Sequence, residues 1–472
     1  MNNDILATLS ITDATRKLAT KEISSLDLVR ACRANIERRN ATLNAYLEVF
    51  DDVEAQAIAA DTRRAMGEKQ KLLGIPLAVK DNILIEGRRA SSASKILEDY
   101  IAPYDATAIK KLKDAGAVFL GRTNMDEFAM GGSTENSAYG PTKNPHDESR
   151  VPGGSSGGSA AALASGMALG ALGSDTGGSV REPASFCGVV GLKPTYGAIS
   201  RSGLMAMGSS LDQIGPLTRT VADAKLLFEA MRGQDPLDST SLDPSFYKEG
   251  LQRKKIGVPR HLLARGVDAD VLKLFEETLK RLQEKGYALV DIELPSAGLA
   301  LAIYYILMPA EASTNLARFD GVRYGLSRRG ESLFDDYACT RGEGFGPEVR
   351  RRIMLGTYVL SAGYYDAYYG KATQARRTLS RECAAALKEV DVIMTPTTPS
   401  PAFLIGEKSD PLSMYLTDIF TVTANLTGNP ALAVPMGEVK RTKINLPASI
   451  QLTAAHGGEA TLFSIGREIE AV

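Results

Sequence analysis

Cysteine is scarce in this chain of 472 residues, and its placement excludes two classes of site. No CxxC motif and no neighbouring histidine accompanies the four cysteines, which are Cys32, Cys187, Cys339 and Cys383. Disulfide frameworks occur in oxidising compartments, and structural zinc sites need clustered cysteine or histidine ligands. We therefore expect four reduced thiols and no metal site in this chain.

An excess of basic residues is also missing. The 55 Lys and Arg residues are balanced by 56 Asp and Glu residues, which gives a formal net charge of −1 at pH 7. A protein that binds nucleic acid by itself normally has a basic surface, because contacts to the phosphates supply much of the affinity. The charge balance therefore argues against nucleic-acid binding by this chain alone.

Sequence criteria reveal no segment that would direct the chain to a membrane. The first residues, MNNDILATLSITDATRKL, lack the basic start and the apolar run of a signal peptide. The best candidate for a membrane span, residues 160–172, is too short and too rich in Gly and Ala to cross a bilayer. We therefore expect a soluble, cytoplasmic protein without membrane contacts.

Glycine beside serine is abundant, and it is concentrated in two loops. These loops are GGSSGGS (153–159) and DTGGS (175–179), and a run of small apolar residues lies between them. Glycine leaves backbone N–H groups uncovered, so that several of them can point at one bound oxygen. A single Gly/Ser loop is more often a flexible linker, but linkers do not flank a core-like segment in two copies. The pair of loops therefore indicates a reaction centre.

A serine nucleophile needs a base, and the three histidines are not placed to supply it. His146, His261 and His456 all lie outside the two loops, and we expect His146 at the surface. A lysine can replace histidine where burial lowers its pKa. Lys80 ends the apolar run GIPLAVK (74–80), which predicts a buried strand. By spacing alone, a salt-bridged structural lysine is the more frequent interpretation of such a residue.

The chain contains GIPLAVKDN, GGSSGGSAAAL, GSDTGGSVREPASFCGVVGLKPTYGAISRSGL and SSLDQIGP, in this order. Together these segments resemble the amidase signature family of serine hydrolases. Other segments, among them NMDEFAMG, STENSAYGPTKNP and DPLSMYLTDIFTVTANLTGNPALAVP, are similar to the glutaminase subunits of tRNA-dependent amidotransferases. The similarity extends over almost the whole chain. It departs from the pattern at Gly132, where serine is usual, and at the shortened C-terminus.

The resemblance implies a triad of Ser179 as nucleophile, Ser155 as bridging serine and Lys80 as the base that acts through it. It also implies a cis peptide bond between Ser155 and the residue that follows. The oxyanion hole would consist of the backbone N–H groups of Thr176, Gly177, Gly178 and Ser179. This arrangement predicts acyl transfer, in which a carboxamide loses ammonia and water hydrolyses the acyl-enzyme.

Glutamine carries a carboxylate and an ammonium group, so its binding site needs an arginine and an acid. The resemblance places these roles on Arg352 and Asp418, with Tyr304 completing the contact. From the sequence alone, the run Arg350-Arg351-Arg352 is more often a solvated basic face. The resemblance reverses that interpretation for Arg352 only.

The expected architecture is an α/β amidase signature fold, with helices on both faces of a mixed central sheet. We expect one domain over residues 1–472, with its core at about 74–223 and a sheet-extending, substrate-recognising region at about 250–472. Residues 106–124 predict a helix that ends near Gly116, followed by a strand. Ser25 is the expected N-cap of an N-terminal helix.

The resemblance implies a glutaminase subunit that frees ammonia for amidation of a misacylated tRNA. Its partners would be the B and C subunits of a heterotrimer, and the tRNA would bind mainly through a partner. No cofactor is expected in this chain, whereas ATP and magnesium are expected on a partner protein. Two alternatives remain: a free-standing amidase for another small amide, and a catalytically silent scaffold. The choice between Gln-tRNA and Asn-tRNA as product stays open.

Overall fold

A single mixed sheet runs through the computed structural model, which describes residues 3–247, 250, 253–264, 266–441 and 444–471. The order of its described strands is β1-β3-β2-β4-β6-β5-β10-β11-β9-β7-β8. The strands are β1 (Tyr46–Val49), β2 (Pro76–Lys80), β3 (Val118–Thr123), β4 (Gly170–Asp175), β5 (Val190–Lys193), β6 (Gln213–Thr218), β7 (Lys255–Val258), β8 (Ala288–Asp291), β9 (Val392–Pro396), β10 (Ala431–Arg441) and β11 (Ile444–Ala454). This confirms the expected mixed α/β architecture.

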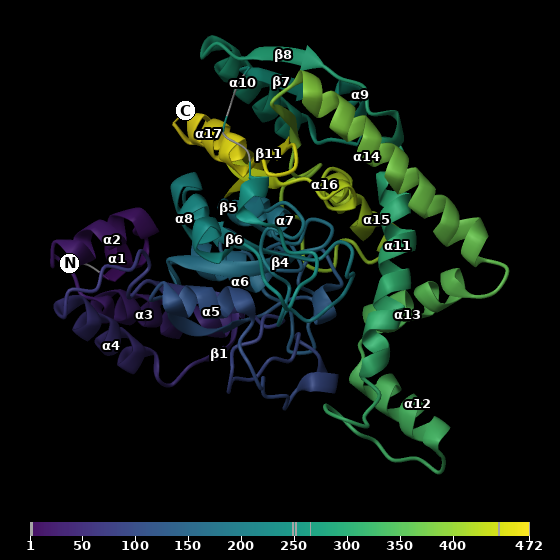
Figure 1. Ribbon diagram of the computed structural model, residues 1–472, viewed down its shortest axis with the longest axis horizontal. Coiled ribbons are helices and arrows are strands. Elements are labelled where there is room, and N and C mark those ends of the chain that lie inside the picture. The colour runs from purple at the N-terminus through teal and green to yellow at the C-terminus, as the bar shows by residue number, and fades with distance from the viewer. Residues whose placement is uncertain (1–2, 248–249, 251–252, 265, 442–443, 472) are drawn as a thin grey trace.

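Helices flank the sheet in rows (Figure 1). The α-helices are α1 (Asn3–Ala7), α2 (Ile11–Ala19), α3 (Ser25–Leu43), α4 (Val53–Ala65), α5 (Thr107–Asp114), α6 (Gly157–Ala164), α7 (Arg181–Cys187), α8 (Val221–Met231), α9 (Arg260–Leu263), α10 (Ala269–Glu284), α11 (Ala300–Asn315), α12 (Leu333–Gly344), α13 (Pro347–Leu360), α14 (Lys371–Glu389), α15 (Pro411–Tyr415), α16 (Val422–Thr427) and α17 (Glu459–Glu470). Helices α8, α17 and α10 form one connected row, whereas α6 and α7 pack against each other and against the central strands.

Parallel pairing of β2 with β4 explains why the two Gly/Ser loops lie close to Lys80. In the register of these strands, Val79 faces Leu172, so Lys80 and the end of β4 emerge at the same edge of the sheet. All five residues of β2 are buried, as the apolar run predicts. The prediction for residues 106–124 is also confirmed, because α5 ends at Asp114 and β3 begins at Val118.

The N-terminal helix begins one residue away from the predicted cap. Ser24, not Ser25, is the N-cap of α3: its hydroxyl accepts a hydrogen bond from the backbone N–H of Asp27, and the Asp27 side chain bonds back. Ser25 is already helical, and its backbone N–H donates to Asp61. The prediction was wrong because either of two adjacent serines fits the cap pattern, and only backbone geometry separates them.

The apolar stretch at 160–172 does not form one helix. It is divided between α6, a turn and β4. In the described part of the chain, one helical stretch, Pro295–Arg318, is long and apolar enough to cross a membrane by length and composition. This stretch contains α11, whose Ile303, Leu307 and Met308 are buried in a hydrophobic cluster. We therefore interpret it as a core helix of the fold.

The hydrophobic cluster that contains these residues lies beside the sheet and joins α11, α13, α14 and α16; we call it the helical cluster. The helices α11 and α13 form one of its closest contacts, and α12 and α13 project away from the sheet (Figure 1). This cluster carries the residues expected to recognise the substrate: Tyr304 on α11, Arg352 on α13, and Asp418 shortly before α16.

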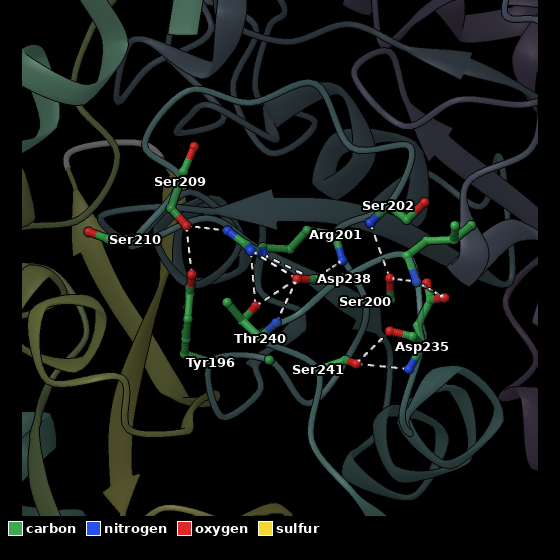
Figure 2. A network of polar contacts seen from close by, with 12 residues as sticks. Tyr196, Ser200, Arg201, Ser202, Ser209, Ser210, Asp235, Asp238, Thr240 and Ser241 are labelled. Carbon is green, nitrogen blue, oxygen red and sulfur yellow. Dashed lines mark hydrogen bonds and ion pairs between the residues drawn. The ribbon is translucent and has the colours of Figure 1, made fainter. Parts of the chain in front are cut away.

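A polar network fastens the loop that leads into β6 (Figure 2). The guanidinium of Arg201 donates to both carboxylate oxygens of Asp238, at 3.2 and 3.0 Å, and to the carbonyl of Ser209. The hydroxyl of Tyr196 donates to the same carbonyl at 2.7 Å. The Arg201 bonds hold the pKa of Asp238 below its usual range, against the effect of burial. The network therefore fixes the backbone at Ser209, three residues before Asp212.

Candidate active site

Lys80 lies at the centre of a buried group of serines. Its Nζ lies 2.8 Å from the Oγ of Ser155, 2.8 Å from the Oγ of Ser156 and 3.0 Å from the Oγ of Ser174. Ser155 and Ser156 come from the first Gly/Ser loop, and Ser174 lies near the end of β4. The ends of β2 and β4 thus bring lysine and serines together, as parallel pairing requires.

Burial lowers the pKa of Lys80 to about 7, although three carboxylates, Asp126, Asp175 and Asp212, act in the opposite direction. The side chain is fully buried, and none of these carboxylates forms an ion pair with it in the described residues. This contradicts the alternative of a salt-bridged structural lysine. A lysine with a pKa near 7 can exchange a proton at neutral pH.

The hydroxyl of Ser155 donates no hydrogen bond to another described residue. Ser156 donates its hydroxyl hydrogen to the carbonyl of Ser174 at 3.2 Å, whereas Ser155 Oγ has only Lys80 as a partner among the described residues. The non-proline cis peptide bond is Gly154–Ser155. The expected position, on the C-terminal side of Ser155, was therefore wrong. The resemblance correctly points to Ser155 as a residue next to the cis bond, but only the backbone geometry shows that the bond precedes it.

Ser179 lies on the second loop, directly against the first. Its carbonyl accepts a hydrogen bond from the backbone N–H of Ser156 at 3.1 Å. The residue is 7% exposed, and its Oγ makes no hydrogen bond to any described residue. Its hydroxyl is therefore both shielded and free to react with a bound molecule.

Asp175 and Arg181 hold the second loop in shape. Both are fully buried, and the Arg181 guanidinium donates to the two Asp175 oxygens at 3.0 and 2.9 Å. Burial raises the pKa of Asp175, but Arg181 outweighs this effect and holds it at about 2. Asp175 also accepts from the backbone N–H of Gly178 at 2.9 Å. The loop therefore bends around an ionised carboxylate.

This contact changes the expected set of oxyanion donors. Because the N–H of Gly178 is directed at Asp175, it is not available to a substrate oxygen in this structure. The backbone N–H groups of Thr176, Gly177 and Ser179 have no acceptor among the described residues. The side chain of Thr176 is fixed separately, because its hydroxyl donates to Asp212 at 2.7 Å. Three of the four predicted donors thus remain free.

Tyr304 covers the same loop. A Cβ added to Gly177 would lie 2.7 Å from the phenolic oxygen of Tyr304, so glycine is required for this close approach. A Cβ on Gly178 would lie 2.4 Å from the Oγ1 of Thr421, whose hydroxyl donates to the carbonyl of Gly177. The helical cluster therefore packs directly on the backbone beside Ser179.

Arg352 points inward, whereas Arg350 and Arg351 are exposed. Its Nε donates to Glu348 at 2.7 Å, one helical turn earlier. Its guanidinium lies over the rings of Tyr305 and Tyr415, each 5.4 Å from the ring centroid. Aromatic faces and a carboxylate thus hold a buried cation in one orientation.

Asp418 is linked to Arg352 through Tyr305. The hydroxyl of Tyr305 donates to Asp418 Oδ2 at 2.9 Å, and its ring stacks on Tyr415 with centroids 3.8 Å apart. Burial raises the pKa of Asp418 to about 7. Sequence reasoning had not identified Tyr305, Tyr415 or Glu348. The spacing of Glu348 four residues before Arg352 was the available signal.

The histidines and cysteines were not expected to act as a base, a metal ligand or a disulfide partner. His146 is exposed, as expected, and its Nε2 lies 3.0 Å from the carbonyl of Cys187. All four cysteines are free thiols. The ranges that the structure describes contain no group of three or more His, Cys, Asp or Glu side chains able to hold a metal ion.

Comparison with known proteins identifies the family. The Amidase family model matches residues 27–463 of the chain. The chain belongs to the amidase family. It is 51% identical over 472 residues to the A subunit of the glutamyl-tRNA(Gln) amidotransferase of Carboxydothermus hydrogenoformans, covering 98% of this chain and 96% of the relative. It is 50% identical over 471 residues to the protein of the same name from Desulfatibacillum aliphaticivorans, with 98% and 96% coverage.

Solved structures of this amidase family share the fold. The crystal structure of the glutamyl-tRNA(Gln) amidotransferase A subunit from Thermotoga maritima superposes with a TM-score of 0.79 at 42% identity, covering 98% of this chain and 95% of that one. The native peptide amidase of Stenotrophomonas maltophilia has a TM-score of 0.81 at 29% identity, with 98% and 96% coverage. The fold alone therefore does not separate the two kinds of amidase, and the site must do so.

Proposed function

We propose that this chain is the glutamine-hydrolysing A subunit of a tRNA-dependent amidotransferase. The buried hydrogen bond between Lys80 and Ser155, beside the free hydroxyl of Ser179, is the observation on which the proposal depends. It supports a reaction centre of the Ser-Ser-Lys type. The names of the relatives, at about half identity over nearly the whole chain, support the choice of subfamily.

In the proposed reaction, Ser179 Oγ attacks the carboxamide carbon of glutamine. Ser155 takes the proton of Ser179 and passes its own proton to neutral Lys80. The developing oxyanion accepts hydrogen bonds from the backbone N–H groups of Thr176, Gly177 and Ser179. The proton returns to the leaving nitrogen, and ammonia departs. Water then hydrolyses the γ-glutamyl ester with the same base, which releases glutamate and restores Ser179.

Recognition of glutamine is proposed for the helical cluster. Arg352 would bind the α-carboxylate, Asp418 would bind the α-ammonium group, and Tyr304 would lie between them and the reacting amide. The supporting observation is that Tyr305 holds Arg352 and Asp418 near each other without an ion pair between them in the described residues. A zwitterionic amino acid needs such a separated pair of charges.

The partners follow from the same proposal. The chain would form a heterotrimer with B and C subunits, and a partner would bind the misacylated tRNA and use ATP with magnesium to activate its Glu or Asp. The chain itself would use no cofactor and would act in the cytoplasm as one domain over residues 1–472. The near-zero net charge supports tRNA contact through a partner.

Glutamate release from glutamine tests the proposal, for the wild type and Ser179→Ala, alone and with candidate partner proteins. We expect release that depends on the partners, increases with charged tRNA and ATP, and disappears in Ser179→Ala. Equal turnover of simple amides without partners would instead identify a free-standing amidase. An inactive but stably assembled complex would identify a scaffold.

A further inference from the structure

Glu182 has a carboxyl group without a partner, three residues after Ser179. It lies in the first turn of α7 and is fully buried. Neither of its carboxyl oxygens makes a hydrogen bond in the part of the chain that the structure describes. Nearly all buried polar groups in proteins are hydrogen-bonded, because an unpaired one is costly. Such a pair of open acceptors suits a ligand that brings its own donors.

The other buried acids around the reaction centre are satisfied, which makes Glu182 an exception. Asp126 accepts from the backbone of Thr134 at 2.8 Å. Asp212 accepts from Thr176 at 2.7 Å. Asp175 is paired with Arg181. The two unpartnered oxygens of Glu182 therefore set it apart from its buried neighbours, and they fit a ligand that supplies hydrogen-bond donors.

The carboxyl group of Glu182 faces the loop at Gly132 and the segment that carries Asp418. A Cβ on residue 132 would lie 3.2 Å from Glu182 Oε2 and 3.3 Å from Thr417 Oγ1. Gly132 offers no side-chain donor, and the hydroxyl of Thr417 donates to the carbonyl of Met414 at 2.7 Å. Thr417 directly precedes Asp418, so the segment beside Glu182 is the one that carries Asp418.

Asp418 is the acid whose charge affects Glu182 most strongly, and with burial it holds the pKa of Glu182 well above its usual range. Lys408 is the nearby cation, but its ammonium lies 4.6 Å from the ring centroid of Phe403 and forms no ion pair among the described residues. Two neighbouring carboxyls that no ion pair neutralises repel each other when both are ionised. A bound positive charge would relieve this repulsion.

We propose that Glu182 joins Asp418 in binding the α-ammonium group of the substrate amino acid. This inference rests on the proposed glutamine hydrolysis. Tyr305 occupies Oδ2 of Asp418, so the open acceptors are Asp418 Oδ1 and both oxygens of Glu182, as far as the described residues show. An ammonium group has three N–H donors, which matches these three acceptors. Glu182 is thus a specificity residue, and Ser179 remains the reacting group.

The test compares glutamine with glutaramate, which has hydrogen in place of the α-ammonium group. Binding of both is measured by calorimetry in the Ser179→Ala background, with and without Glu182→Gln, for the chain alone and assembled with candidate partner proteins. Loss of one charge-assisted contact weakens binding by about tenfold or more. We expect this loss for glutamine, with the affinity for glutaramate unchanged. In the active complex, kcat/KM should fall for glutamine only.

Glu127→Gln is the matched control, because Glu127 is equally buried but partnered by the hydroxyl of Ser94 and the backbone N–H of Gly346. It should leave the ratio of the two affinities unchanged. Equal weakening of both ligands by Glu182→Gln, or no weakening, would overturn the inference while glutamine hydrolysis stands. If Ser179→Ala binds glutamine in no assembly and the wild type does not hydrolyse it, the proposed function fails as well.

Discussion

The pH dependence of turnover gives the most quantitative test of the proposed base. Burial lowers the pKa of Lys80 from 10.5 to about 7, and a general base acts only in its unprotonated form. As the pH falls through 7, Lys80 gains a proton and activity is lost. As the pH rises above 7, the neutral amine dominates and activity levels off. About one lysine in ten would be neutral at about pH 6 and about nine in ten at about pH 8.

Asp418 titrates in the same range and must be separated from Lys80. Its pKa is raised to about 7 by burial, so it also loses its functional form as the pH falls. Once glutamine is bound, however, the ammonium group keeps Asp418 ionised. The pH profile of kcat reports the bound complex, and that of kcat/KM reports the free enzyme. We therefore expect one proton in the acidic limb of kcat and a steeper limb in kcat/KM.

Glutamate release is measured at saturating glutamine from about pH 5.5 to about pH 9, with circular dichroism at each pH to show that the protein remains folded. The expected kcat falls about fivefold from about pH 7 to about pH 6 and approaches a tenfold change per pH unit at lower pH. Lys193→Met is the matched control, because Lys193 is also buried with a pKa of about 7, but its Nζ donates to the carbonyl of Pro194 at 2.8 Å. A flat kcat profile, a midpoint near 10, or a limb lost in Lys193→Met would refute the assignment.

Two further substitutions test the loop and the scaffold. Gly177→Ala places a methyl group 2.7 Å from the ring of Tyr304, and we expect kcat/KM to fall by about 10²-fold or more, as for loss of an oxyanion donor. Gly298→Ala, where a Cβ meets nothing within 4 Å, should be neutral, and similar losses in both would contradict the argument. Ser24→Ala removes a helix cap and should lower the free energy of unfolding by about 1 kcal/mol, seen as a lower Tm with kcat unchanged.

The central part of the site could be predicted because its signals are local. An apolar run ending in Lys80 predicts a buried strand, and parallel strands must deliver their following loops to one edge. The Gly/Ser loop that follows β4 is therefore expected at the same edge of the sheet as Lys80. The role of each residue came from the family resemblance, since spacing alone favoured a structural lysine. Local pattern therefore located the candidate site, and the resemblance supplied the roles proposed for its residues.

Other features depend on contacts between distant segments, and the sequence could not reveal them. The hydrogen bond that removes Gly178 from the free donors depends on the bend of the loop around Asp175. Tyr304 and Tyr305 are adjacent on α11, yet one covers Gly177 and the other bonds Asp418. Which tyrosine faces which partner is decided by the packing of α11 against α13, not by either residue's own neighbours in the chain.

The arrangement of charges around Tyr305 also bears on the choice between a glutaminase and a general amidase. Arg352 and Asp418 form no ion pair with each other among the described residues, so neither charge neutralises the other. Here the Nε of Arg352 donates a hydrogen bond to Glu348, and the guanidinium lies over the ring of Tyr305. The hydroxyl of Tyr305 donates to Oδ2 of Asp418. Arg352 and Asp418 each keep donor or acceptor atoms that are free for a ligand among the described residues. A neutral amide would leave these atoms unused in a buried site, so the geometry favours a substrate with both charges.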